Sequence, residues 1–288
     1  MSLAARSLTY RYPDAPFPAV DGVDLEARDG RVTCLLGATG SGKSTLLRAM
    51  AGLVAPTAGE ALVDGAPTWV RRGVLGRPRR RPGLPRAVGY VMQRPERQLF
   101  AATVAEDAAF GPRNLGATDA EAAEAAEAAL GFLGIRHLAC RSPFELSGGQ
   151  QRLAAIAGVL AMDPANLVLD EPMAALDPEG RAIVRDAVAH LASRRGAVLL
   201  VTHDMDDAAS LAASVAVLDR GRVALSGSPA EVFSRSGELR RLGLGLPSAL
   251  EAAHLLRERR GVDVGEPLTL DALADALAGL ARGPREGA

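Results

Sequence analysis

The residues best suited to chemistry form the glycine-rich stretch GATGSGKST over residues 37–45. It follows an apolar run, RVTCLL, and precedes a helical pattern, LLRAMAGL. Glycines let backbone N–H groups converge on phosphate oxygens, and the start of the next helix adds a positive dipole end. We predict that Lys43 reaches the β- and γ-phosphates of a triphosphate and that Ser44 ligates Mg²⁺. The predicted cradle consists of Gly37, Ala38, Thr39, Gly40, Ser41, Gly42, Lys43, Ser44 and Thr45.

Two adjacent carboxylates follow an apolar run in NLVLDEP, over residues 166–172. Asp170 can bind Mg²⁺ directly or through water. The side chain of Glu171 points in a different direction, because successive strand residues alternate, and it can polarise a water for attack on the γ-phosphate. Taken alone, the pair reads more simply as two solvated acids at a strand end. The phosphate-binding stretch upstream favours the functional interpretation.

A histidine, His203, occupies a similar place in LLVTHD. Its neutral imidazole can hydrogen-bond the γ-phosphate or the attacking water near Glu171. A lone histidine at a strand end is more often structural. Its role here depends on the sheet, because one carboxyl edge should carry Ser44, Asp170 and His203 together.

The stretch LSGGQ, over residues 146–150, is too polar and glycine-rich for a protein core. Ser147 suits a helix N-cap, and Gly148 and Gly149 expose backbone donors at a helix start, which makes a second anion site. One chain already binds its triphosphate at residues 37–45, so this second anion site is expected to bind the nucleotide of another subunit. A plain helix cap would explain the serine but neither the glycines nor Gln150.

Three short apolar runs are expected to be the strands that position these groups, at residues 31–36, 166–169 and 197–201. Their alternation with helical patterns predicts an α/β fold with a mixed-sheet core and ligands at the carboxyl edge. Residues 2–29 alternate between apolar and polar types. They predict an antiparallel β subdomain with a turn at residues 13–18.

The rest of the chain divides into two predicted parts, a helical insertion and a set of later elements that begins with a hairpin. Residues 118–133, rich in alanine and glutamate, belong to a helical insertion over about 98–147, within a helical subdomain of about 98–160. The later elements are a hairpin over 214–227 that turns at 219–221, helix or turn over 229–241, and two amphipathic helices over 248–259 and 269–280. We predict a nucleotide-binding domain over 1–230 and a small C-terminal helical module over 231–288.

Composition narrows the function classes. The 288 residues include 33 Lys and Arg and 34 Asp and Glu, so a general basic surface for nucleic acid is not indicated. The two cysteines, Cys34 and Cys140, and the lack of a secretory leader fit a reducing compartment. No apolar run approaches the roughly 18 residues of a membrane-spanning helix, so work at a membrane would require docking to another protein.

The chain resembles the ATP-binding-cassette (ABC) ATPases, which have a P-loop NTPase fold, because these motifs follow one another in the order typical of that family. The resemblance covers nearly residues 1–230. It implies that residues 37–45 are the Walker A loop, that NLVLDEP is the Walker B strand, and that LSGGQ is the signature. It also implies that Tyr12 stacks on adenine, that Gln93 is the Q-loop residue near nucleotide and metal, that residues 174–177 are the D-loop, and that His203 is the switch histidine. In that family two cassettes dimerise head to tail, with each ATP between the Walker A loop of one and the signature of the other.

A more specific resemblance is to the energy-coupling factor (ECF) importers of cobalt, nickel and vitamins. Their Q-loop region commonly reads like QNPDDQLF, followed by EDVAFGP and NLG. The matching residues are Gln93, Pro95, Gln98, Leu99, Phe100, Asp107, Phe110, Gly111, Pro112, Asn114, Leu115 and Gly116, whereas Arg94, Glu96 and Arg97 depart. The C-terminal module also resembles the tail that helps to hold the dimer of these ATPases together.

The resemblance implies partners and a location. The expected partners are a second ABC ATPase subunit, identical or paralogous, an integral membrane component and a membrane component that binds the substrate. A helix of the membrane component would enter a groove lined by Gln93 and the QLF segment. The protein would then lie at the cytoplasmic side of the cell membrane. The transported substrate is not readable from these residues.

Two other functions compete with transport. A soluble cassette acting on DNA or ribosomes usually carries a long coiled coil or a second cassette, and this sequence has one Walker A loop and no long heptad run. A subunit that binds ATP but barely hydrolyses it would not need Glu171 and His203. We interpret the arginine-rich residues 70–86 as a solvated, proline-broken surface loop. The alternative is a contact for anionic lipid headgroups.

Overall fold

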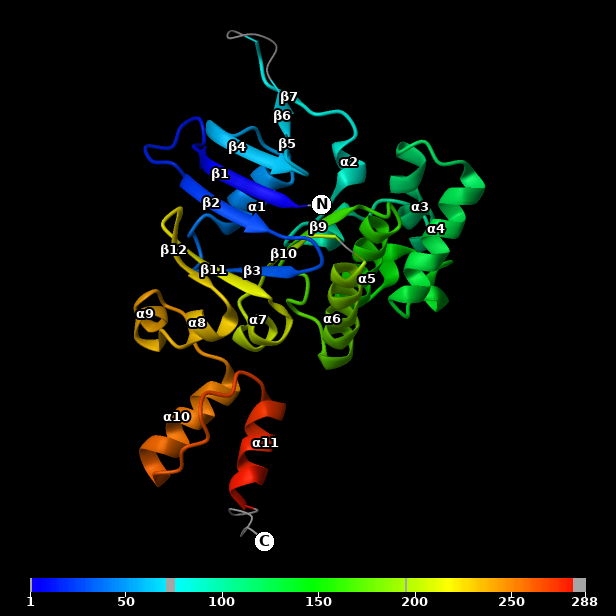
Figure 1. Cartoon of the computed structure of the whole chain (residues 1–288). Coiled ribbons are helices and arrows are strands. Elements are labelled where there is room, and N and C mark those ends of the chain that lie inside the picture. Colours follow the sequence, from blue (N-terminus) through cyan, green and yellow to red (C-terminus); the bar gives the residue numbers. More distant parts are fainter. Residues whose placement is uncertain (1, 71–75, 195, 282–288) are drawn as a thin grey trace.

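Two β-sheets enclose helix α1 (Lys43–Met50) in the computed structural model, which describes residues 2–70, 76–194 and 196–281 (Figure 1). One side of the helix packs on the antiparallel sheet, and the other side packs on the six-stranded sheet. Leu46, Leu47 and Met50 are fully buried between the sheets. The position of the helix fixes the phosphate-binding stretch, because that stretch leads directly into it.

The six-stranded sheet has the order β12-β11-β3-β10-β9-β8, and all its neighbours are parallel except β12 and β11. The strands are β3 (Val32–Leu36), β8 (Val88–Val91), β9 (Asn166–Asp170), β10 (Val198–Val201), β11 (Ser214–Asp219) and β12 (Arg222–Gly227). Successive residues of β3 face different cores: Cys34 and Leu36 lie in one and Leu35 in the other. The predicted mixed-sheet α/β core and the hairpin over 214–227 are confirmed.

The smaller sheet has the order β2-β1-β4-β5 and is antiparallel throughout. Its strands are β1 (Leu3–Tyr10), β2 (Val20–Ala27), β4 (Ala58–Val63) and β5 (Ala66–Pro67). Strands β1 and β2 turn back on each other between Tyr10 and Val20, as the alternating pattern predicts. This sheet covers the outer side of α1.

Three helices to one side of the sheets form the helical region: α3 (Val104–Asn114), α4 (Asp119–Phe132) and α5 (Gly148–Leu160) (Figure 1). Each begins at a capping box. The hydroxyl of the N-cap residue accepts a hydrogen bond from the backbone N–H three residues later, and the side chain of that later residue accepts one from the backbone N–H of the N-cap residue. The pairs are Thr103 with Glu106, Thr118 with Glu121, and Ser147 with Gln150. These local signals explain why the helix over 118–133 was predictable.

The remaining helices support the sheet edge and form the C-terminal part. They are α2 (Leu84–Ala87), α6 (Pro178–Ser193), α7 (Met205–Leu211), α8 (Pro229–Phe233), α9 (Ser236–Arg241), α10 (Ser248–Arg260) and α11 (Leu270–Ala281). Short 3₁₀ turns occur at Pro95–Gln98, Arg136–Leu138 and Pro143–Glu145. In the described part of the chain, no helix combines the length and the apolar character that crossing a bilayer requires.

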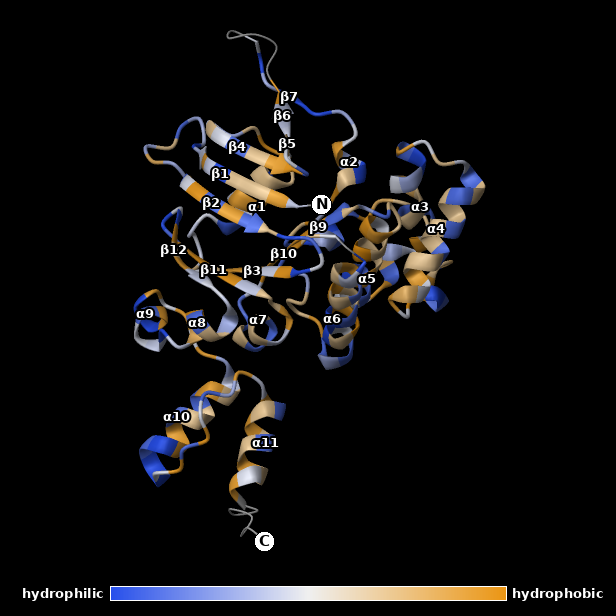
Figure 2. Ribbon diagram, in the orientation of Figure 1, coloured by the Kyte–Doolittle hydropathy of each residue, from blue (hydrophilic) through white to orange (hydrophobic). Residues whose placement is uncertain are grey.

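Helices α10 and α11 pack on each other and extend away from the sheets (Figure 1). Figure 2 shows that the far end of α10 is strongly hydrophilic, where Arg257, Arg259 and Arg260 lie. The main cluster of buried apolar residues continues through Phe233 to Leu250. The division at residue 230 remains a prediction, and the packing joins α8 and the start of α10 to the preceding core.

The arginine-rich segment differs in part from the expected loop. Strands β6 (Trp69–Val70) and β7 (Arg79–Arg80) pair antiparallel, and Arg81 N donates to Thr68 O at 2.9 Å beside them. Residues 71–75 lie outside the described residues. The sequence analysis did not predict this short pair of strands, in which backbone groups satisfy each other. Arg79 and Arg80 are exposed, and a lipid contact stays a prediction.

Candidate functional site

The phosphate-binding stretch connects β3 to α1 through three glycines with positive φ: 149° at Gly37, 82° at Gly40 and 103° at Gly42. A Cβ at Gly37 would lie 2.3 Å from Leu218 O, and one at Gly42 would lie 2.2 Å from Ala19 O. These distances are too short for any side chain. The neighbouring backbone therefore dictates glycine at Gly37 and Gly42, and the loop keeps its N–H groups unobstructed.

Lys43 folds back over this loop. Its Nζ donates to Gly37 O at 2.7 Å and to Ala38 O at 2.9 Å. Burial lowers the pKa of Lys43, while the charges of Glu171 and Asp170 raise it. The ammonium group thus sits at the mouth of the loop, where it can exchange carbonyl oxygens for phosphate oxygens.

Asp170 ends β9 and lies in register with Val201 of β10, which in turn lies in register with Leu35 of β3. Its side chain is almost wholly buried, and neither carboxylate oxygen has a hydrogen-bond partner among the described residues. Burial raises the pKa of Asp170, while the nearby Ser44 hydroxyl lowers it. Buried oxygens without partners need an explanation, and a Mg²⁺ that also takes phosphate and water ligands fits this pair.

Glu171 has a left-handed backbone, with φ of 53°. Such a conformation costs a residue other than glycine about 1–3 kcal/mol and is characteristic of functional sites. Its N–H donates to Val201 O at 3.0 Å, which ties it to the end of β10. Its Oε1 lies 2.7 Å from His203 Nε2, and His203 is more exposed than Glu171. The carboxylate and the imidazole therefore form a pair at the same edge as Asp170.

Arg152 joins several parts of this edge and was not singled out by the sequence analysis. It is 7% exposed, and its guanidinium donates to Glu171 O at 3.1 Å, to Ala174 O and to Gln93 O at 3.2 Å. It also lies 3.4 Å from Glu96 Oε2. The available signal was an arginine on an otherwise apolar helix, because such a charge needs partners when it is buried. Through Arg152, α5 is fastened to the backbone of Glu171.

Three of the predicted residues or motifs stand apart from this cluster. Gln93 supplies its backbone oxygen to Arg152, while its side chain is exposed. Tyr12 is 40% exposed, and its hydroxyl lies 3.1 Å from Thr45 Oγ1, beside the start of α1. The signature stretch caps α5, with Gln150 N donating to Ser147 Oγ at 3.3 Å and Ser147 N donating to Gln150 Oε1 at 3.1 Å. Helix capping therefore accounts for Gln150 as well as Ser147, contrary to the expectation from the sequence, and leaves only the glycines unexplained. In the described part of the chain, the signature stretch shares no hydrogen bond with residues 37–45.

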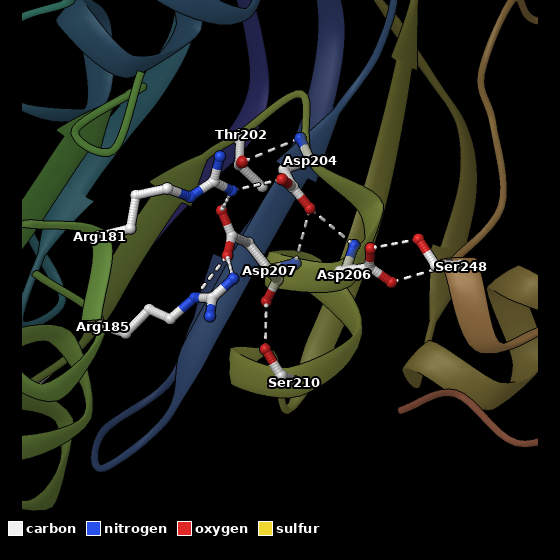
Figure 3. A network of polar contacts seen from close by, with 8 residues as sticks. All are labelled: Arg181, Arg185, Thr202, Asp204, Asp206, Asp207, Ser210 and Ser248. Atoms are coloured by element: carbon white, nitrogen blue, oxygen red, sulfur yellow. Dashed lines mark hydrogen bonds and ion pairs between the residues drawn. The ribbon is translucent and has the colours of Figure 1, made fainter. Parts of the chain in front are cut away.

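A polar network holds the backbone on both sides of His203 (Figure 3). Asp204 N donates to Thr202 Oγ1 at 3.1 Å, and Asp204 itself caps α7. Burial would raise the pKa of Asp204, but the bond from Arg181 and further bonds lower it overall. Arg181 and Arg185 of α6 also pair with Asp207, whose side chain is 1% exposed. These ion pairs fasten the start of α7, which follows His203, to α6.

A surface groove of about 410 Å³ lies between α3, α5 and the loop before α3. Phe100 and Phe110 line it with their rings edge to face at 4.7 Å, and both are about half exposed. Asp107 Oδ2 accepts from Phe100 N at 2.7 Å and from Ala101 N at 2.9 Å, which fixes the loop. One exposed aromatic ring on this loop and another on α3 suit the binding of an apolar helix.

Comparisons with known proteins agree with this geometry. The family model described as ABC transporter matches residues 20–174. The energy-coupling factor transporter ATP-binding protein EcfA2 of Symbiobacterium thermophilum is 44% identical over 292 residues, covering 100% of this chain and 99% of that protein. The structure of cbiO1 from Clostridium perfringens, part of the ABC transporter complex cbiONQ, has a TM-score of 0.70 and 35% identity, covering 88% of this chain and 98% of that one. A dimeric ATP-binding cassette in a post-hydrolysis state, bound to ADP and Pi, has a TM-score of 0.69 and 25% identity, covering 79% and 98%.

Proposed function

The chain belongs to the ABC transporter family, in its energy-coupling factor group of ATP-binding proteins, and on that premise we propose that it energises a membrane importer by hydrolysing ATP. One observation carries the proposal. Neighbouring strands β3, β10 and β9 bring a glycine loop with its lysine, a buried carboxylate without partners and a Glu171–His203 pair to one edge. Phosphate binding, metal binding and water activation need these three groups together.

In the proposed mechanism, Lys43 leaves Gly37 O and Ala38 O and binds the β- and γ-phosphates. Asp170 and Ser44 would hold Mg²⁺, which would supply positive charge beside the phosphate oxygens. Glu171 accepts a proton from a water whose oxygen attacks the γ-phosphorus, and the bond to the bridging oxygen breaks to release ADP. His203, 2.7 Å from Glu171, orients that carboxylate.

The signature glycines support a role for a second subunit. A Cβ at Gly148 would meet nothing within 4 Å, and one at Gly149 would only touch Leu176 at 3.5 Å. Neither has a positive φ, so neither the packing nor the backbone of this chain requires glycine. Glycine also weakens a helix relative to alanine. The open space at the start of α5 suits close approach of a phosphate held by another cassette, and we infer a head-to-tail dimer.

Gly148→Ala separates these requirements. We expect the melting temperature of the isolated protein to stay the same or to rise slightly, because alanine favours the helix and meets no neighbour. We expect ATP hydrolysis to fall by about tenfold or more, because the new methyl group occupies the proposed phosphate approach. Thermal unfolding and steady-state phosphate release measure the two effects. Gly237→Ala, another open glycine away from the site, is the control. Full hydrolysis by Gly148→Ala would contradict the dimer site.

The groove and the C-terminal helices are the surfaces on which we expect the membrane component and the second cassette to bind. We propose that the groove at Phe100 and Phe110 receives a helix of an integral membrane component and that a separate membrane component binds the substrate. Leu270, Leu277 and Leu280 of α11 are exposed and suit contact with the second cassette. The protein would then work at the cytoplasmic side of the membrane, on a cobalt or nickel ion or a vitamin as substrate.

Co-purification and hydrolysis test this function together. The protein should hydrolyse ATP with Mg²⁺ and should be retained by its integral membrane partner in detergent. Phe100→Asp should abolish retention and leave nucleotide binding intact, with the exposed Phe17→Asp as its control. Retention without hydrolysis would contradict the catalytic assignment, and hydrolysis without any membrane partner would contradict the transport assignment. A soluble cassette for DNA or ribosomes is not favoured by the relatives.

A further inference from the structure

The start of α10 is capped by a residue from a different helix. Its N-cap is Pro247, which has no side-chain hydrogen bond to offer. Asp206 of α7 takes this place: Ser248 N donates to its Oδ1 at 2.8 Å and Ser248 Oγ donates to its Oδ2 at 2.6 Å (Figure 3). Both oxygens of one carboxylate thus hold one residue, and the negative charge suits the helix start.

The other side of this contact leads to the catalytic histidine. Asp206 lies three residues after His203, and its N–H donates to Asp204 Oδ1 at 2.9 Å. Asp204 N donates in turn to Thr202 Oγ1, so the bonds continue to the residue before His203. Arg181 holds Asp204 from α6. The path from Ser248 to the histidine loop therefore consists of direct hydrogen bonds.

Few other bonds fasten the C-terminal helices. Among the described residues, Ser248 is the sole member of α10 and α11 with a hydrogen bond or ion pair to the chain before Pro247. Apolar packing is concentrated at the same end, where Ala249, Leu250 and Ala253 are buried. Helix α7 has seven residues, and so short a helix depends on outside contacts for its stability. A displacement of the C-terminal pair would therefore first break the hydrogen bonds between Ser248 and Asp206.

We propose that the Asp206–Ser248 contact couples the C-terminal helical pair to catalysis by positioning the His203 loop. Asp206 and Ser248 are positioning residues, because they act on the reacting groups through His203 and its 2.7 Å contact with Glu171. The inference rests on the proposed ATPase function. When the pair is seated, the contact keeps the first turn of α7 formed and the imidazole aimed at Glu171. When the pair is displaced, the turn loosens and turnover falls.

Hydrogen exchange of the nucleotide-free full chain tests the physical link without any need for hydrolysis. Ser248→Pro removes both donors at the first helical position, where proline is tolerated. We expect peptides covering residues 203–211 to exchange at least about threefold faster, because the first turn of α7 loses its support. Ser234→Ala, which removes a hydroxyl bond to Glu231 O in the same region, should leave them unchanged. Unchanged exchange in a folded Ser248→Pro protein would overturn the proposal.

Kinetics test the catalytic consequence. We expect kcat to fall about threefold in Ser248→Ala and about tenfold in Ser248→Pro, with KM for ATP unchanged because the phosphate-binding loop is untouched. Ser248→Thr keeps both donors and should retain the wild-type kcat. In a His203→Ala background, Ser248→Pro should cause no further loss.

The outcomes separate this inference from the proposed function. Faster exchange with an unchanged kcat would overturn the coupling, and so would a full additional loss in the His203→Ala background. A wild-type protein that fails to hydrolyse ATP would refute the proposed function instead, while the exchange measurement would still decide whether the contact supports α7.

Discussion

Glu171→Gln is expected to lower ATP turnover by about 10²–10³-fold while ATP binding persists. The amide can still lie beside His203, 2.7 Å away in the native pair, but it cannot accept the proton of the attacking water. The phosphate-binding loop and Asp170 are unchanged, so the variant should hold ATP without cleaving it. Because the proposed dimer closes around ATP, the variant should also accumulate as a dimer with ATP and Mg²⁺.

Single-turnover hydrolysis and light scattering during size-exclusion chromatography measure these two effects. Glu124→Gln makes the same chemical change at an exposed position of α4 and should behave like the wild type. Unchanged turnover in Glu171→Gln would refute the role of this carboxylate. Lost turnover without an ATP-dependent dimer would leave its role in catalysis intact and contradict the proposed closure.

Asp170→Asn is expected to have opposite effects on activity and stability. Hydrolysis should fall by at least about 100-fold, because the proposed Mg²⁺ site loses its carboxylate ligand and the phosphates then lose the charge stabilisation that the metal would supply. The nucleotide-free protein should instead melt a few degrees higher. Asp170 is a buried carboxylate without a hydrogen-bond partner among the described residues, and an amide of the same shape carries no charge to desolvate.

The stability gain should depend on pH in a defined direction. Burial raises the pKa of Asp170, so the folded protein binds this proton more tightly than the unfolded chain does. The cost of the charge is absent below the unfolded value of about 3.9, grows as the pH rises, and is complete above the folded pKa. The difference in melting temperature between variant and wild type should therefore be largest at neutral pH and should disappear in acid.

Melting curves without Mg²⁺ or nucleotide measure this difference. Asp186→Asn, at an exposed position of α6, serves as the control and should show no such gap. A variant less stable than the wild type at neutral pH would mean that the Ser44 hydroxyl and the charges of Arg48 and Lys43 outweigh the burial of the Asp170 carboxylate, which would remove the argument for an open metal position.

The strands and the helical caps were predictable because their signals are local. The apolar runs before Gly37 and His203 and the serine at Ser147 each identify an element from its own residues. That these strands run parallel agrees with the general behaviour of alternating α/β chains, whereas their order, with β10 between β3 and β9, was not predicted. The edge that carries the candidate site could thus be anticipated.

Long-range side-chain contacts could not be read in this way. Arg152 binds backbone oxygens that lie up to 59 residues away in the chain, and no spacing rule identifies carbonyl partners. The Asp206–Ser248 contact spans 42 residues and depends on how α10 packs. The β6–β7 pair was missed because prolines and arginines conceal the backbone complementarity of so short a ladder.

The burial of α1 between two sheets affects how mutational scans of this protein will read. Leu46 and Leu47 follow Lys43 closely, and each is buried with 0% exposure. A growth-based screen will score polar replacements at these leucines as inactive, like changes at Lys43, although the buried leucines have no surface that could contact a nucleotide. Abundance measurements will separate the two groups, because only the leucine variants should vanish from the cell.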